Sequence, residues 1–256
     1  MTSSPCVVCS DPGSALSCKT CSSAAYCSTT CPNKDVDIQG VFLNHSCFSN
    51  TILYAIDDFA FACRAVKNIK KGEELTTNYL HYQYHLFGLN YRQRELFESC
   101  HRCKDFTEFG TLSDALVCKE CEQGRLIPLN MNPGSEWVCS TCYGSQTSED
   151  VMMVITYWWN IIDTASKYDI KVLMELLQKT LKVFDKNHYY NLEVKRRIIE
   201  NIGDSKGNKY EDLAEAWLEK KVEFCKDHLN IQKILAPGLS EYLLILTYSR
   251  ATLLAH

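Results

Sequence analysis

The sequence predicts an α+β protein in which three kinds of composition follow one another along the chain. Cysteine pairs at short spacing, separated by Pro, Gly and Ser, fill residues 1–34. Short runs of β-branched and aromatic residues follow within residues 35–105. From residue 149 to residue 256, apolar residues recur at spacings of three and four. These patterns are typical of metal-stabilised loops, β-strands and α-helices, in that order.

The overall composition excludes two classes of partner. The formal net charge of −4 and the pI near 6.0 lack the basic balance of a nucleic-acid-binding surface, so we expect no nucleic-acid footprint. No apolar run approaches the roughly 18 residues of a membrane span, and the first residues lack the features of a secretory signal, so we expect no membrane contact. We therefore expect a cytoplasmic or nuclear protein; the sequence does not predict an oligomeric state.

The cysteine content points to metal sites. The chain has 15 cysteines, and only Cys225 lies beyond Cys142. In a reducing compartment, repeated C-x2-C pairs more often hold zinc than form disulfides. We therefore predict zinc sites along the first 142 residues.

Residues 1–34 lack the apolar periodicity that would build a core, so metal binding would have to supply their folding free energy. Two C-x2-C pairs are followed by a C-x3-C pair, made by Cys6, Cys9, Cys18, Cys21, Cys27 and Cys31. With Tyr26 before Cys27, this run resembles the first three quarters of a MYND zinc finger. The resemblance implies one complete site, formed by Cys6, Cys9, Cys27 and Cys31. It also implies a half-site at Cys18 and Cys21, because the His-x3-Cys pair of that family does not follow.

Two polar runs define the segment 35–105. The run Asn44–Asn50 follows a short apolar stretch and contains amides, an imidazole, a hydroxyl and a thiol. Polar groups placed beside a core in this way need hydrogen-bond partners. The run Gly72–Tyr79 includes a turn and a predicted strand from residue 75. Between the two runs, the β-branched and aromatic residues of 52–66 predict a hairpin. A helix is predicted around residues 84–98.

These runs carry a specific resemblance. Asn44-His45-Ser46-Cys47 with Asn50, the run Gly-Glu-Glu-Leu-Thr before Tyr79, and the pair Cys100 and Cys103 resemble the C-terminal half of a SET domain. The finger on the same chain points to the SET-and-MYND family of protein-lysine methyltransferases. The resemblance implies a partial β-rich SET domain with a post-SET zinc region. It also implies S-adenosylmethionine as cofactor and a protein or peptide substrate, such as a histone.

The resemblance assigns roles to three residues of these runs. Asn44 and His45 would hold S-adenosylmethionine, and Tyr79 would place its hydroxyl beside the transferring methyl group. Taken without the resemblance, Tyr79 could instead be a core tyrosine that closes a strand, and His45 could be a general base.

The same resemblance makes Cys47 a zinc ligand together with Cys100 and Cys103. The family usually offers three cysteines after the helix, as C-x-C-x2-C, and this chain has two. His101 lies between them in a poor position to be the fourth ligand.

One part of the family pattern is missing. Only 12 residues separate Cys31 from Asn44, and no Gly-x-Gly turn, against which the cofactor lies in that family, occurs in the chain. We therefore predict an internal deletion that removes the end of the finger and the N-terminal half of the SET domain. An incomplete pocket works against catalysis, so the sequence leaves open whether the chain is an enzyme. The alternative is a catalytically inactive, zinc-dependent protein-interaction module; a structural zinc protein of unrelated function is a third reading.

Residues 106–148 predict a further zinc site. Cys118-x2-Cys121, 17 residues, and Cys139-x2-Cys142 form the spacing of two zinc knuckles. We expect a structural zinc, because four thiolates close the open position that a catalytic zinc needs.

Residues 149–256 predict helices with short connections. Apolar spacing favours helices over 151–165, 170–184, 189–202, 210–229 and 240–254. No clear 34-residue repeat is visible. The runs 187–190 and 237–240 resemble the tetratricopeptide-like C-terminal domain of the same family.

Overall fold

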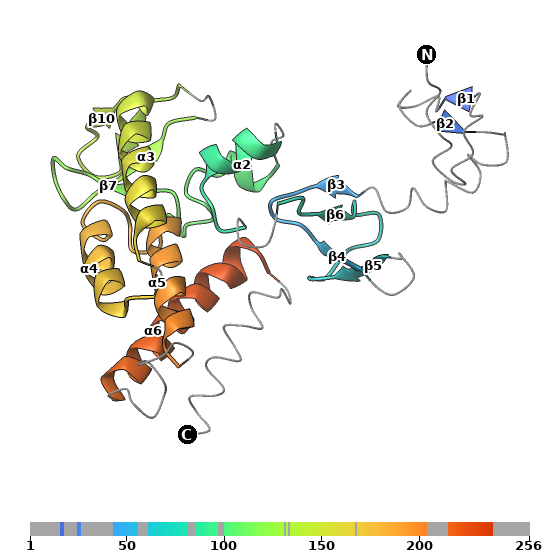
Figure 1. Cartoon of the computed structure of the whole chain (residues 1–256). Coiled ribbons are helices and arrows are strands. Elements are labelled where there is room, and N and C mark those ends of the chain that lie inside the picture. Colours follow the sequence, from blue (N-terminus) through green and yellow to red (C-terminus); the bar gives the residue numbers. More distant parts are fainter. Residues whose placement is uncertain are drawn as a thin grey trace, which may run out of the picture. The chain divides into compact units, whose positions relative to one another are not determined.

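The computed structural model describes residues 16–17, 25–26, 43–55, 61–80, 85–96, 100–130, 132, 134–166, 168–203 and 215–237. The chain comprises two compact units (Figure 1), Met1–Asn44 with Leu53–Cys63, and His45–Ile52 with Arg64–His256. No helix in the described part of the chain is long and apolar enough to span a bilayer.

The N-terminal segment contains one described strand pair, in which β1 (Leu16–Ser17) runs antiparallel to β2 (Ala25–Tyr26). The predicted finger ligands all lie outside the described residues, namely Cys6, Cys9, Cys18, Cys21, Cys27 and Cys31. The two zinc sites predicted there stay predictions.

The segment that contains the two polar runs has four described strands and one described α-helix. β3 (Asn44–His45) pairs with β6 (Thr76–Thr77), and β4 (Thr51–Ala55) pairs with β5 (Phe61–Ala65). The β4–β5 pair confirms the predicted hairpin, while β6 is shorter than the strand predicted from residue 75. Helix α2 (Leu89–Leu96) lies within the predicted helical range 84–98.

A four-stranded antiparallel sheet follows the short 3-10 helix η2 (Arg102–Lys104). Its order is β10-β9-β8-β7. Its strands are β7 (Leu116–Val117), β8 (Arg125–Pro128), β9 (Trp137–Cys139) and β10 (Ser145–Gln146). The two cysteine pairs of this region lie at the turns β7–β8 and β9–β10.

Four helices form the described C-terminal part: α3 (Ser148–Thr164), α4 (Ile170–Thr180), α5 (Tyr189–Asn201) and α6 (Glu215–Leu235). They agree with four of the predicted helices, and the fifth, 240–254, lies outside the described residues. Helices α3, α4 and α5 each follow an N-cap residue whose side chain accepts backbone N–H groups of the first turn. These N-cap residues are Thr147, Asp169 and His188. Figure 1 shows α5 between α4 and α6, with which it packs.

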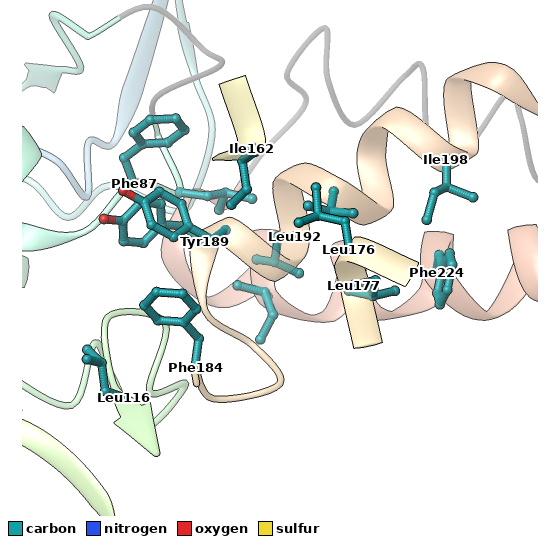
Figure 2. Close-up of a cluster of buried hydrophobic side chains, with 14 of the residues drawn as sticks. Phe87, Leu116, Ile162, Leu176, Leu177, Phe184, Tyr189, Leu192, Ile198 and Phe224 are labelled. Atoms are coloured by element: carbon teal, nitrogen blue, oxygen red, sulfur yellow. The ribbon is translucent and has the colours of Figure 1, made fainter. Parts of the chain in front are cut away.

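One hydrophobic core joins the helices to the four-stranded sheet. In Figure 2, Leu116 of β7 and Phe87 lie near Phe184 and Tyr189, and helical leucines and isoleucines extend the cluster to Phe224. The core also contains Trp137 and the cysteines Cys118 and Cys139. The cysteine-rich sheet therefore shares one hydrophobic core with the helices.

Candidate functional site

The two polar runs meet along the β3–β6 pair, and the buried amide of Asn50 joins them. Asn50 is 3% exposed. Its Oδ1 accepts a hydrogen bond from the Thr76 N–H at 2.8 Å, and its Nδ2 donates to the Glu74 carbonyl at 2.8 Å. The Ser46 N–H donates to the Thr77 carbonyl at 2.9 Å. The hydrogen-bond partners that the first run requires are therefore supplied by the second run.

His45 occupies the centre of this crossing. The Tyr79 N–H donates to its Nδ1 at 3.1 Å, and its Nε2 lies 3.1 Å from the Cys47 Sγ. Because Nδ1 accepts, the neutral ring carries its proton on Nε2 and donates it to the Cys47 sulfur. Both ring nitrogens are thus engaged, which argues against His45 as a general base.

Tyr79 presents its ring to solvent beside His45. Its side chain is 56% exposed, and the two ring centroids lie 5.3 Å apart. The alternative that Tyr79 is a core tyrosine is therefore wrong. Asn44 begins β3 on the exposed side of the strand, next to the buried His45.

The structure brings Cys47, Cys100 and Cys103 together. Their sulfurs all lie within 4.8 Å of one another, with Cys47 to Cys103 at 3.7 Å and Cys100 to Cys103 at 3.8 Å. A tetrahedral zinc with Zn–S bonds of about 2.3 Å would place its sulfurs about 3.8 Å apart. A disulfide would need about 2.05 Å. The arrangement fits a metal ion and excludes a disulfide between these residues.

Hydrogen bonds within this three-cysteine cluster shift the pKa values of Cys100 and Cys47 in opposite directions. The pKa of Cys100 is lowered, chiefly by its side-chain hydrogen bonds with Cys103 and Cys47. The pKa of Cys47 is raised by its hydrogen bonds to Cys100 and Cys103, and by burial. A zinc ion binding here would displace the remaining thiol protons, since thiolates are the ligands.

Among the described residues, the cluster contains three ligand-type groups and no fourth. His101, the residue between its two C-terminal cysteines, stacks on Phe109 with ring centroids 5.5 Å apart. The expected three-ligand arrangement therefore agrees with the geometry.

The second cluster is formed by Cys118, Cys121, Cys139 and Cys142, whose sulfurs also lie within 4.8 Å of one another. Cys118 to Cys142 and Cys121 to Cys139 are each 3.7 Å. These distances match a closed four-thiolate zinc site.

Backbone N–H groups surround the sulfurs of this four-cysteine cluster. The Gly124 N–H donates to the Cys121 Sγ at 3.3 Å, and the Cys142 N–H donates to the Cys139 Sγ at 3.5 Å. The pKa of Cys121 is lowered, chiefly by the Gly124 N–H. Such N–H groups stabilise thiolates, so the two turns are built for bound metal.

A buried ionic network lies beside the three-cysteine cluster and was not predicted. Glu108 binds Arg92 of α2 at 2.5 Å through one oxygen and Arg102 of η2 at 2.6 Å through the other. Both arginine side chains are 0% exposed. The sequence carries no periodic signal for this network, because a buried charge is recognised only by its partners.

The sequence comparisons agree with this geometry. Residues 13–80 match the family model of the SET domain. That match begins inside the segment predicted as a finger and ends directly after Tyr79. Over 106 residues the chain is 33% identical to the SET domain-containing protein SmydA-8, isoform A, of Drosophila melanogaster, which covers 39% of this chain and 23% of that protein.

Residues 13–80 of this chain are therefore similar to a SET domain. The similarity to SmydA-8 agrees with the resemblance to the SET-and-MYND family that the motifs carry. The match spans less than a quarter of the relative's length, 23%. The predicted MYND finger and the tetratricopeptide-like domain stay predictions.

Proposed function

We propose that this protein is a methyltransferase that transfers a methyl group from S-adenosylmethionine to a lysine of a protein or peptide, histones included. The observation that carries the proposal is the crossing of the two polar runs. The amide of Asn50 joins the two runs, and the Tyr79 N–H donates to the His45 ring, so Asn44 and His45 of β3 lie beside the segment that follows β6 and contains Tyr79.

The reaction sets the requirements for these residues. The uncharged lysine nitrogen attacks the methyl carbon, the bond from that carbon to the sulfonium sulfur breaks, and a lysine proton leaves to solvent. S-adenosylmethionine supplies the methyl group when bound. Asn44 and His45 would bind it, and the Tyr79 hydroxyl would position the reacting groups, since alignment supplies much of the rate in such a displacement.

We further propose that zinc fills both described cysteine clusters in a structural role. The sulfur spacings support this role: they fit zinc at Cys47, Cys100 and Cys103, and at the four-cysteine cluster. The N-terminal cysteines would bind zinc in the same way.

A zinc-dependent interaction module without methyl transfer is the second candidate. Two observations favour it. The chain lacks Gly-x-Gly, and Tyr79 is 56% exposed, whereas methyl transfer requires exclusion of water. In this reading, peptide partners bind to the same chain and are released unmodified.

The test uses the zinc-loaded whole chain with S-adenosylmethionine labelled in its methyl group. Calorimetry measures cofactor binding, and transfer of label to a histone mixture and to lysine-rich peptides measures activity. We expect labelled lysine, with turnover at least tenfold lower in Tyr79→Phe. Tyr143→Phe is the matched control, because Tyr143 is 80% exposed and lies in the cysteine-rich sheet. Absence of both cofactor binding and label transfer would reject the methyltransferase in favour of the second candidate.

A further inference from the structure

The ionic network of Arg92, Glu108 and Arg102 carries an unbalanced charge. Two guanidinium groups share one carboxylate, at 2.5 and 2.6 Å, and all three side chains are at most 2% exposed. Arginine stays protonated in proteins. One positive charge is therefore buried in excess, which costs several kcal/mol unless an anion compensates it.

The hydrogen bonds of the two arginines are also incomplete. The Nε of Arg92 and one terminal nitrogen of Arg102 are buried without a hydrogen-bond partner. Within the described part of the chain, the nearby Asp114 forms no ion pair with either arginine, and both arginines pair with Glu108. Burial raises the pKa of Asp114 to about 7, and its Oδ2 accepts the Leu89 N–H at 2.9 Å.

The excess charge lies next to the three-cysteine cluster. Cys47 and Cys103 pack against Leu89 in one buried cluster, and Arg92 follows Leu89 by almost one helical turn. Arg102 directly precedes Cys103 in η2.

The charge of a zinc site depends on its ligands. Three thiolates around Zn²⁺ carry a net charge of about −1, and four thiolates, or three thiolates and a carboxylate, carry about −2. Only the first value matches a single excess positive charge. His45 fits the same picture, since its Nε2 proton points to the Cys47 sulfur at 3.1 Å and the ring stays neutral.

We propose that the Arg92–Glu108–Arg102 network is the counter-charge of a three-thiolate zinc site at Cys47, Cys100 and Cys103, and that this zinc takes a neutral fourth ligand, with water as the ligand available from solvent. The inference rests on the zinc binding proposed above. It distinguishes this site from the closed four-cysteine site on the same chain. The network residues position and balance the metal without binding it.

The ligand count can be measured on the unaltered protein. In the whole chain loaded with ¹¹³Cd, each bound cadmium gives an NMR resonance whose shift reports how many sulfurs surround it. We expect one resonance in the range of three sulfurs with one oxygen or nitrogen. It should vanish in Cys47→Ser, while the resonance that depends on Cys118 remains. A four-sulfur shift for the resonance that depends on Cys47 would overturn the inference and leave zinc binding intact. If no resonance depends on Cys47, zinc binding at this site is itself rejected.

Two pairs of variants test the proposal, with zinc affinity measured by competition with a chromophoric chelator. The first pair tests the charge balance. Arg92→Met removes the charge at similar length and should weaken zinc binding at this site at least tenfold, as loss of outer-shell partners commonly does. Arg92→Lys keeps the charge and should restore most of the affinity. The four-cysteine site is the internal reference and also shows that the variant is folded. Equal zinc affinity in Arg92→Met and the unaltered chain would overturn the counter-charge role.

The second pair tests the neutral ligand. Glu98 lies two residues before Cys100 in the sequence, outside the described residues, and is the nearest acidic residue before the cluster. Glu98→Gln should leave zinc affinity unchanged. A tenfold loss in Glu98→Gln would identify a carboxylate as the fourth ligand and overturn the inference. Glu120→Gln, near the four-cysteine site, is the matched control for loss of one acidic charge.

Discussion

Replacing Gly124 with alanine should selectively weaken zinc binding at the four-cysteine cluster. A Cβ at this position would lie 2.2 Å from the Cys139 sulfur and 3.0 Å from the Cβ of Thr141. Gly124 also holds the first turn through its own backbone. Its N–H donates to the Cys121 Sγ and its carbonyl accepts the Cys118 N–H.

The size of the effect follows from these distances. Ordinary van der Waals contact begins near 3.4 Å, so the Cys139 sulfur would have to move by about 1 Å. Zinc–ligand distances vary by only about 0.2 Å among sound sites, and the surrounding core cannot easily yield because Cys139 is fully buried. Overpacking of this kind costs about 1–3 kcal/mol, or roughly 5- to 150-fold in zinc affinity.

Chelator competition on the whole chain measures this affinity, and thermal unfolding with and without chelator measures its contribution to stability. Gly134→Ala is the matched control, because a Cβ there would meet nothing within 4 Å. The site at Cys47 should be unaffected in both variants. Equal zinc affinity for Gly124→Ala and Gly134→Ala would refute the assignment of these four cysteines as a tightly packed zinc site.

Three further predictions concern stability, each measured by urea unfolding of the whole chain. Gly88→Ala should lower the free energy of unfolding by about 1–3 kcal/mol, because its Cβ would lie 1.9 Å from an Asp114 oxygen and 2.8 Å from the Tyr189 ring. Burial raises the pKa of Asp114 from 3.8 to about 7. The folded protein therefore keeps a proton that the unfolded chain loses, and the contribution of Asp114 to stability should fall as pH rises through this range. Asp114→Asn should remove that slope, and an unchanged slope would contradict the assignment. Burial lowers the pKa of His228 from 6.5 to about 4, so the contribution of His228 to stability should fall as pH drops from 6.5 towards 4, opposite in sign to that of Asp114. His228→Gln should lessen this second loss, and a variant with the same acid sensitivity as the unaltered chain would refute it.

Local patterns were predictable from the sequence because their physics is local. The C-x2-C pairs at Cys118 and Cys139 each form one tight turn, and the structure brings the four sulfurs within 4.8 Å of one another. The helices α3 to α5 follow the apolar spacing and begin at capping residues such as Thr147 and Asp169. In each case, a few neighbouring residues decide the conformation.

The buried network could not be predicted in the same way. Arg92 and Arg102 are polar residues that ordinarily lie in solvent, and only the fold brings both to Glu108, which is 16 and 6 residues away in the sequence. The shared core of the cysteine-rich sheet and the helices was missed for the same reason. Leu116 and Phe184 meet across a long stretch of chain that no periodicity connects.

The residues of the crossing differ in what they reveal about activity. Asn50 is 3% exposed, and its side chain satisfies two backbone groups of the second polar run, at Glu74 and Thr76. Folding alone therefore requires it, whether or not a methyl group is transferred. His45 likewise satisfies the Tyr79 N–H and contacts the Cys47 sulfur. The side chain of Tyr79 is 56% exposed, and exposing a large aromatic ring brings the fold little benefit. The presence of Asn50 and His45 is therefore explained by the fold, whereas packing alone does not explain the exposed ring of Tyr79.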